Sequence, residues 1–109
     1  MAYASTLAAL ADPTRRALFE RLGRRAHTVG ELARLAGITQ PAASQHLGVL
    51  RRARLVTSTR DGTRRHYRAS RRGLEELRRY VDSLWADVLA AYADDAPTVA
   101  GRQRKGRSR

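Results

Sequence analysis

Residues 28–52 read TVGELARLAGITQPAASQHLGVLRR, and this stretch decides the fold. Thr28 and Glu31 have the spacing of a capping box, in which each side chain accepts a hydrogen bond from a backbone N–H at the start of a helix. The pattern predicts a helix over residues 31–36. Gly37 is placed to end that helix in a left-handed conformation, which glycine adopts without strain.

A second helix follows after a three-residue turn. Thr39 suits its N-cap, and Pro41 falls in the first turn, where a missing N–H removes no hydrogen bond. We expect this helix to cover residues 40–52. Its inward face comprises Ala43, Leu47 and Leu50. Two helices joined by a short turn that contains glycine predict a helix-turn-helix.

A β-hairpin is predicted directly behind the second helix. Strand-forming residues run from Leu55 to Thr59, Asp61-Gly62 is a two-residue turn signal, and Arg64–Ala69 forms the return strand. Such a hairpin is a wing. Its tip carries Arg60, Arg64 and Arg65.

Two helices are expected before this region. The first covers residues 3–11, and Asp12-Pro13 then provides an N-cap and a first-turn proline for a helix that ends near residues 23–25. The residues expected on the buried faces of the helices before the turn are Ala17, Leu18, Leu22, Leu32 and Leu35.

The longest periodic segment covers residues 73–93. Its apolar residues are Leu74, Leu77, Val81, Leu84 and Val88, with Trp85, Leu89 and Tyr92 widening the stripe. This helix has more apolar face than a small core needs, which favours packing against a partner helix across a twofold axis. The alternative is an ordinary core helix. Its acidic outer residues would be repelled by DNA phosphates, so we expect it on the far side from DNA.

The net charge of +12 over 109 residues indicates a partner that carries phosphates. Residues 51–72 hold nine Arg and one Asp, a net charge of +8, whereas residues 73–96 hold two Arg and six acidic residues, a net charge of −4. Residues 97–109 add +5 and are expected to be a disordered tail that either contacts phosphates or only solubilises the chain. The sequence predicts one folded domain over residues 1–96.

Several classes of protein are disfavoured. There is no Cys, which excludes disulfides, thiolate metal sites and Cys nucleophiles. The three His are scattered, and no glycine-rich phosphate loop is present, so we expect no catalytic residues, no cofactor and no metal site. There is no apolar run of about 20 residues and no secretory signal pattern. We therefore expect a cytoplasmic protein without a membrane partner.

The second helix of the helix-turn-helix carries the polar groups that suit base edges in a major groove. Gln40, Ser44 and Gln45 form its outward set, and Ala42 and Ala43 could touch a thymine methyl. His46 fits a DNA contact and a packing role equally, while Thr39 fits an N-cap better than a base contact. The wing arginines suit phosphates or the minor groove. Arg15 and Arg16 are weaker candidates for phosphate contacts.

The strings LADPTRRALFERL (10–22), ELARLAGITQPAASQHLGVLRRARLV (31–56) and TRDGTRRHYR (59–68) resemble the ArsR-type winged-helix transcriptional repressors. The resemblance covers about residues 5–93. It implies a bacterial homodimeric transcriptional repressor that binds double-stranded DNA. The implied fold is mainly α with a small β-hairpin wing and about five helices. By motif position it implies DNA contacts from Gln40, Pro41, Ser44, Gln45 and His46, beside Arg60, Arg64 and Arg65.

The resemblance also implies that the first and last helices form the dimer layer. The residues expected there are Tyr3, Leu7, Leu10, Leu77, Val81, Leu84, Trp85 and Val88. Metal-sensing members of the family carry Cys in the helix before the turn, or Asp and His ligands in the last helix. This chain has Val29-Gly30-Glu31-Leu32 at the first place and no His at the second. It therefore resembles the branch whose small-molecule or protein inducer is absent, non-metallic or unidentified.

The predicted function is sequence-specific regulation of transcription, with repression at a pseudo-palindromic operator. One alternative is a sequence-tolerant architectural nucleic-acid-binding protein driven by arginine and the basic tail. Another is a protein-interaction module whose apolar helix docks on a different partner. Competition with random DNA distinguishes a sequence-specific regulator from the architectural protein. Sedimentation of the pure chain tests whether it forms a homodimer.

Overall fold

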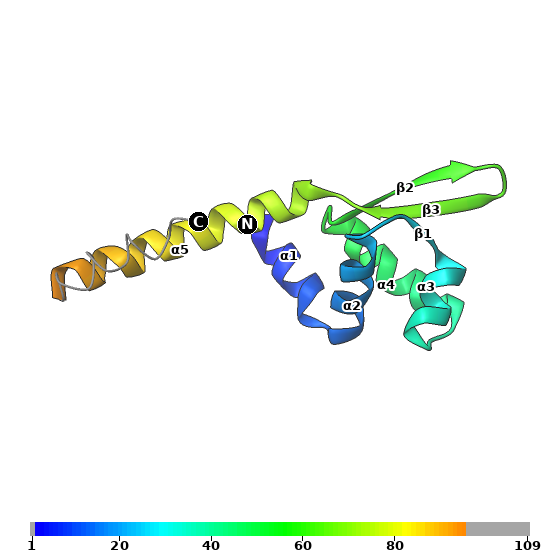
Figure 1. Ribbon diagram of the computed structural model, residues 1–109, viewed down its shortest axis with the longest axis horizontal. Coiled ribbons are helices and arrows are strands. Elements are labelled where there is room, and N and C mark those ends of the chain that lie inside the picture. Colours follow the sequence, from blue (N-terminus) through cyan, green and yellow to red (C-terminus); the bar gives the residue numbers. More distant parts are fainter. Residues whose placement is uncertain (1, 96–109) are drawn as a thin grey trace. The chain divides into compact units, whose positions relative to one another are not determined.

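The computed structural model describes residues 2–95, and these contain five helices and three short strands (Figure 1). Along the chain the elements are α1 (Ala2–Ala11), α2 (Pro13–Leu22), β1 (His27–Thr28), α3 (Val29–Ala36), α4 (Gln40–Arg52), β2 (Val56–Asp61), β3 (Arg64–Ala69) and α5 (Arg71–Asp95). The chain divides into two units, residues 1–77 and residues 78–109. The predicted fold class, helices with a small wing, is confirmed. The predicted tail over 97–109 lies outside the described residues, and the predicted domain over 1–96 stays a prediction.

The predicted caps are present at the starts of α2, α3 and α4. Asp12 Oδ1 accepts a hydrogen bond from the backbone N–H three residues on, at 3.0 Å. In the capping box, Thr28 Oγ1 accepts from the N–H of Glu31 at 3.2 Å, and Glu31 Oε1 accepts from the N–H of Thr28 at 3.0 Å. Thr39 Oγ1 caps α4 by accepting from the N–H of Ala42 at 3.2 Å, without a reciprocal bond. Gly37 ends α3 with a φ of 69°, in the left-handed region. Because α3 starts directly after its cap, it begins two residues before the predicted start at Glu31.

Two arginines of α2 close the C-terminal end of α1. Arg15 Nε donates to the carbonyl of Ala9 at 2.8 Å and its Nη2 donates to that of Ala8 at 3.3 Å. Arg16 Nη1 donates to the carbonyl of Leu10 at 2.8 Å. The last carbonyls of a helix have no partner inside the helix, so these guanidinium groups supply the missing donors. The sequence suggested phosphate contacts for this pair and did not indicate this structural role.

The wing belongs to a three-stranded antiparallel sheet with the order β1-β3-β2. In β1, His27 pairs with Tyr67 and Thr28 pairs with His66. A two-residue strand has no readable alternation, so the sequence did not predict β1. The ladder ties the base of the wing to the residue that caps α3.

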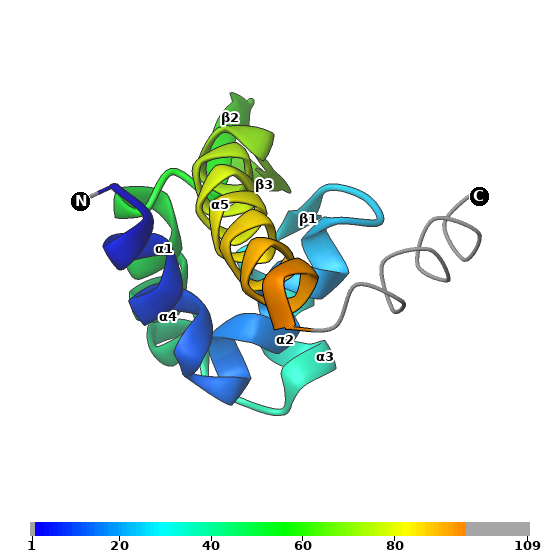
Figure 2. The ribbon, with the colours of Figure 1, turned by 90° about the vertical axis from the view of Figure 1, so that its left-hand side faces the viewer.

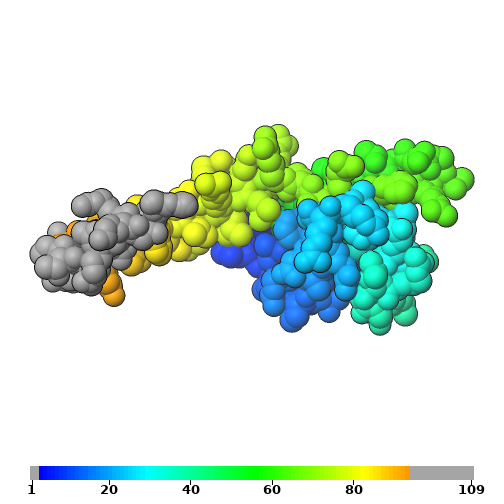
Figure 3. Space-filling view, in the orientation of Figure 1, coloured from blue at the N-terminus to red at the C-terminus, as the bar shows by residue number. Residues whose placement is uncertain are grey.

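The turn of the wing is shifted by one residue from the predicted Asp61-Gly62. Asp61 pairs with Arg64 across the hairpin, so the two loop residues are Gly62 and Thr63. Gly62 has a φ of 66°, and Thr63 is not among the residues with positive φ. Positive φ at the first loop position alone is the requirement of a type II′ turn, which glycine meets there without strain. The predicted turn would have needed positive φ at an aspartate. In the space-filling view the wing projects beyond the helices of its unit (Figure 3).

The core lies between α1, α2, α3, α4 and the base of the wing (Figures 1 and 2). Its fully buried leucines are Leu18, Leu32, Leu47, Leu50 and Leu55. The prediction of burial is wrong for two residues: Ala17 is exposed, and Leu35 is 48% exposed. The inward face of α3 is instead Val29, Leu32, Ala33 and Ala36. These positions follow the helical spacing of 3, 4 and 7, which leaves Leu35 on the flank.

A tight junction joins α4, β2 and α5. Arg54 adopts a left-handed φ of 64° just beyond α4, and the N–H of Leu55 donates back to the carbonyl of Leu50 at 2.9 Å. Gly73 is buried in the first turn of α5, and its N–H donates to the carbonyl of Arg54 at 3.1 Å. A Cβ on Gly73 would lie 2.7 Å from the carbonyl oxygen of Ala53. Only glycine permits this close approach.

Apolar side chains are exposed on α1 and on α5. In α1 the buried residues are Thr6 and Ala9, while Leu7 is 44% exposed and Tyr3 and Leu10 are half-buried. Leu77, the last residue of the first unit, is half-buried. Within the second unit, the exposed apolar residues of α5 are Val81, Leu84, Trp85, Val88, Leu89 and Tyr92, with Trp85 the most exposed at 62%.

Candidate nucleic-acid interface

The outward face of α4 is polar and accessible. Gln40, Pro41, Ser44 and Gln45 are exposed, and His46 is half-buried. On the opposite side Ala43, Leu47 and Leu50 are fully buried, as the spacing predicts. The side chain of Thr39 is engaged as the N-cap, which agrees with the structural interpretation of this residue. The geometry therefore leaves short polar side chains free at the N-terminal half of α4, where a recognition helix meets base edges.

The same face continues into two arginines. Arg51 and Arg52 are exposed and lie seven residues after Ser44 and Gln45, close to two helical turns, so they share their face. Gly48 lies between the two pairs, and Arg52 Nη1 lies 3.6 Å from where a Cβ on Gly48 would be. Sequence reasoning did not single out these arginines as candidate contacts, although the seven-residue spacing was available to find them.

The wing carries exposed arginines in an arrangement that is unfavourable by itself. Arg60 and Arg65 are directly opposite each other on β2 and β3, and like charges in this position repel. Arg65 Nη1 donates to Ser58 Oγ at 3.2 Å. Arg64 is opposite Asp61, next to the turn. A phosphate near the tip would relieve the repulsion between the two facing guanidinium groups.

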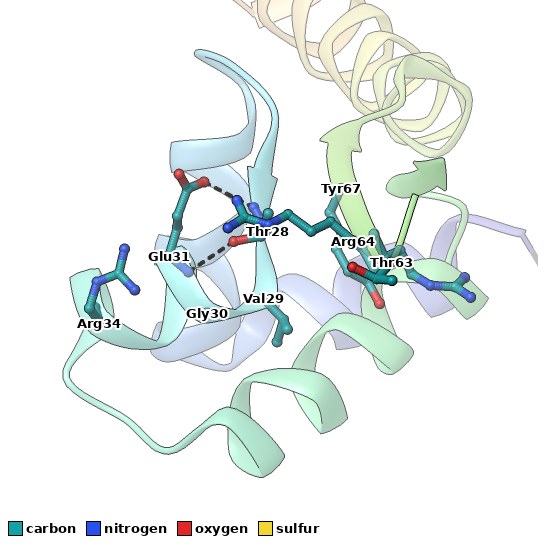
Figure 4. Close-up of a pocket in the computed structure, with 9 residues that line it drawn as sticks. Thr28, Val29, Gly30, Glu31, Arg34, Thr63, Arg64 and Tyr67 are labelled. Atoms are coloured by element: carbon teal, nitrogen blue, oxygen red, sulfur yellow. Dashed lines mark hydrogen bonds between the residues drawn. The ribbon is translucent and has the colours of Figure 1, made fainter. Parts of the chain in front are cut away.

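A groove of about 500 Å³ separates α3 from the wing (Figure 4). One side is formed by the start of α3 and the other by β3 and the turn of the wing. The residues that line it are Thr28, Val29, Gly30, Glu31, Arg34, Thr63, Arg64, Arg65 and Tyr67. The capping box lies in its α3 side, where Figure 4 draws the two reciprocal hydrogen bonds. Three arginines against one carboxylate make the groove electropositive.

Two carboxylates near α4 and the groove, those of Asp12 and Glu31, accept hydrogen bonds from backbone N–H groups at helix starts. The backbone N–H of Thr28 lowers the pKa of Glu31 below its usual value, and Arg25, with Nη1 3.9 Å from Glu31 Oε1, adds to the effect. The backbone N–H of Arg15 likewise lowers the pKa of Asp12. Both side chains therefore stay ionised at neutral pH, and their charges are directed at N–H groups.

Gln40 connects the groove to α4. A Cβ on Gly30, in the first turn of α3, would lie 3.3 Å from Gln40 Nε2. The amide of Gln40 thus rests against the start of α3, at the edge of the groove. The structure brings this predicted contact residue together with the groove, while Ser44 and Gln45 lie one turn further along α4.

A helix-turn-helix followed by a basic hairpin defines a winged helix-turn-helix protein, a class that binds DNA. Residues 10–59 match the family model described as a helix-turn-helix domain. The HTH-type transcriptional regulator Rv2034 of Mycobacterium tuberculosis is 51% identical to this chain over 85 residues, which are 78% of this chain and 79% of that protein. The chain belongs to the ArsR family of winged helix-turn-helix transcriptional regulators.

Solved structures agree with this assignment. The ArsR-like transcriptional regulator from Rhodococcus sp. RHA1 superposes with a TM-score of 0.71 at 32% identity, covering 87% of this chain and 92% of that chain. The homodimeric winged helix-turn-helix DNA-binding domain of Mb0332 from Mycobacterium bovis gives a TM-score of 0.64 at 27% identity, covering 81% and 82%. The relatives are transcriptional regulators, and the chain is accordingly a DNA-binding regulator of transcription.

Two negative findings apply to residues 2–95. None of the helices there has the length and apolar character to cross a membrane. In the same residues, no three side chains among His, Asp and Glu are grouped so that they could hold a metal ion.

Proposed function

We propose that this protein is a repressor that binds a pseudo-palindromic operator as a homodimer in the cytoplasm. The observation that carries the proposal is the outward face of α4, where Gln40, Ser44 and Gln45 are exposed beside a basic wing. A glutamine amide can pair with the Hoogsteen edge of adenine through two hydrogen bonds, and a serine hydroxyl can serve a base or a phosphate. Repression is supported by relatives that are named as repressors.

The wing and the groove would supply the phosphate contacts. Arg60, Arg64 and Arg65 lie on the wing, and Arg34 extends the positive surface to α3. Contacts to phosphates fix the position of a protein on the duplex, whereas contacts to base edges provide sequence preference. We therefore assign base readout to α4 and positioning to the wing.

The homodimer is supported by the apolar side chains on α1 and on α5. On α5, Val81, Leu84, Trp85 and Val88 follow helical spacing and are between 44% and 62% exposed, and a contiguous row of exposed apolar side chains is typical of an interaction surface. A relative of known structure is described as homodimeric. Two copies related by a twofold axis would read two half-sites about 34 Å apart, one turn of the duplex.

Selection from a random duplex pool tests this proposal. We expect the wild-type protein to enrich an inverted repeat, and the enriched duplex to compete far better than random duplex at matched salt. An architectural protein, which the net charge of +12 would also suit, predicts no enriched motif and a competition ratio near one. An enriched single half-site without a repeat would contradict the dimeric mode of binding.

A further inference from the structure

A second basic groove lies where the end of α4, the start of β2 and the start of α5 meet, all within the first unit. Its volume is about 480 Å³. Three arginines and three hydroxyl-bearing residues line it: Arg51, Arg54, Arg72, Thr57, Ser58 and Ser70. None of the residues that line it carries a carboxylate. We name it the phosphate groove. It shares no lining residue with the groove beside α3, and its Ser58 accepts a hydrogen bond from Arg65, which lines that other groove.

The positive charge of the phosphate groove is only partly compensated. Arg54 Nη1 lies 3.6 Å from Glu76 Oε2. Within residues 2–95, neither Arg51 nor Arg72 has a carboxylate within ion-pair distance. Both side chains are exposed, so no packing requirement explains why two further cations are placed here.

The start of α5 increases this positive charge. The first turn holds no acidic residue and instead begins with Arg71 and Arg72. The N-terminal end of a helix is its positive end and favours anions, so Arg72 in this place opposes the local field, whereas Arg71 is paired with Glu75, with its Nε 3.5 Å from Glu75 Oε2. An anion in the groove would be attracted by the arginines and by the helix terminus together.

The hydroxyl groups are available as donors. Ser70 Oγ accepts from the N–H of Arg72 at 3.3 Å, and Ser58 Oγ accepts from Arg65 Nη1 at 3.2 Å. Each hydroxyl uses an oxygen lone pair in these bonds and retains a proton that can be donated. Tetrahedral phosphate oxygens accept several hydrogen bonds, and arginine and hydroxyl groups are their usual partners in proteins.

The position of the groove indicates where the phosphate comes from. Arg51 lies on the same face of α4 as Ser44 and about 10 Å further along the helix axis. We propose that the phosphate groove binds a backbone phosphate of the same duplex whose bases face Ser44 and Gln45. The proposal rests on the DNA binding described above. A free phosphorylated small molecule has the same chemistry, and the experiment separates the two sources.

The test measures binding of a random-sequence duplex across a series of salt concentrations. The variants are Arg51→Gln, Arg72→Gln and the two together, which leave Arg54 and its ion pair intact. Losing one phosphate contact lowers the slope of log affinity against log salt by about 0.9, so a fourfold rise in salt should weaken the double variant about 3-fold less than the wild type. Arg24→Gln is the matched control, because Arg24 is exposed and lines neither groove.

Two further measurements complete the test. The preference for a selected duplex over random duplex should stay unchanged in the double variant, and its unfolding midpoint should match the wild type because both side chains are exposed. A salt slope equal to that of the wild type overturns the proposal. Binding of inorganic phosphate to the free protein, seen as saturable shifts of the Ser70 and Arg72 amide resonances, together with a wild-type slope in the variants, assigns the groove to a free anion instead. If the wild type binds no duplex, the proposed function fails first.

Discussion

The guanidinium of Arg15 lies against the last turn of α1, with its Nε 2.8 Å from the carbonyl oxygen of Ala9. Three residues earlier, Asp12 starts α2 by accepting a hydrogen bond from the N–H of Arg15 itself. One short segment therefore ends α1 and begins α2. This explains why the two helices can be joined by a single residue without leaving the carbonyls of α1 unpaired.

Arg15→Ala should lower the free energy of unfolding by about 1–2 kcal/mol, because it removes a part-buried charged hydrogen bond to the carbonyl of Ala9 and an exposed one to that of Ala8. Denaturant unfolding measures the change. Arg24→Ala, at an exposed position, should stay within about 0.5 kcal/mol of the wild type. An unchanged stability with weakened DNA binding would instead make Arg15 a phosphate contact.

Gly73→Ala and Gly48→Ala should have opposite effects on stability. A Cβ at Gly73 would lie 2.7 Å from a backbone oxygen and 3.1 Å from Leu55 Cδ2, so the junction must shift at a cost of about 1–3 kcal/mol. A Cβ at Gly48 would meet only the flexible end of Arg52 at 3.6 Å, and alanine should stabilise α4 by about 0.5–1 kcal/mol. Thermal unfolding of both variants provides the comparison. Equal stability for the two would contradict the close approach at Gly73.

Acid should destabilise the protein through its two carboxylate caps. Hydrogen bonds from the backbone N–H groups of Arg15 and Thr28 lower the folded-state pKa values of Asp12 and Glu31 below their unfolded values. The stabilisation that the two carboxylates give the folded state is therefore complete above their unfolded-state pKa values, near pH 4. It is lost as the pH falls through their lowered folded-state pKa values. Asp12→Asn with Glu31→Gln keeps acceptor oxygens without a titrating group. In unfolding midpoints measured from about pH 6 to pH 2.5, that variant should show a flatter dependence than the wild type.

The N-caps of α2, α3 and α4 could be predicted from the sequence because each depends on a local pattern. Asp12, Thr28 and Thr39 cap their helices through hydrogen bonds that span three residues, which a linear sequence displays directly. The strand β1 could not be predicted, because it exists only through pairing with a segment about 40 residues away. Leu35 was misplaced because a short helix allows two apolar stripes, and packing selects the one through Ala33.

In the candidate site, too, local features could be predicted from the sequence and long-range features could not. The exposure of Ser44 and Gln45 follows from the helical periodicity of α4 and was predictable. The two grooves were not, because each brings together segments that are distant in the sequence. The link between Gln40 and Gly30 also depends on how α3 and α4 cross.

Gln45→Ala should weaken binding to a selected duplex by about 1–3 kcal/mol and leave binding to random duplex unchanged, because its amide is assigned to a base edge. Arg64→Ala should weaken binding to both duplexes and lower the salt slope by about 0.9. Fluorescence anisotropy with both duplexes measures each quantity. Equal losses of Gln45→Ala on both duplexes would rule out base readout by this residue.

Leu84→Glu with Trp85→Glu should convert a dimer into a monomer, because both side chains are exposed apolar groups of α5. Sedimentation equilibrium should show the mass falling from that of two chains to that of one. Asp87→Ala, on the same helix, is the matched control and should leave the dimer intact. A wild-type chain that sediments as a monomer would refute the dimer directly.

The pairing of His27 and Thr28 with β3 has a consequence for how such a regulator can diverge. Thr28 caps α3 while its backbone belongs to the same ladder as the wing. The position of the start of α3 relative to the base of the wing is thereby held by main-chain hydrogen bonds, which side-chain substitutions leave in place. Under the proposed base readout by α4, substitutions at residues 40–45 would change the preferred DNA sequence and leave the main-chain link between α3 and the wing unchanged.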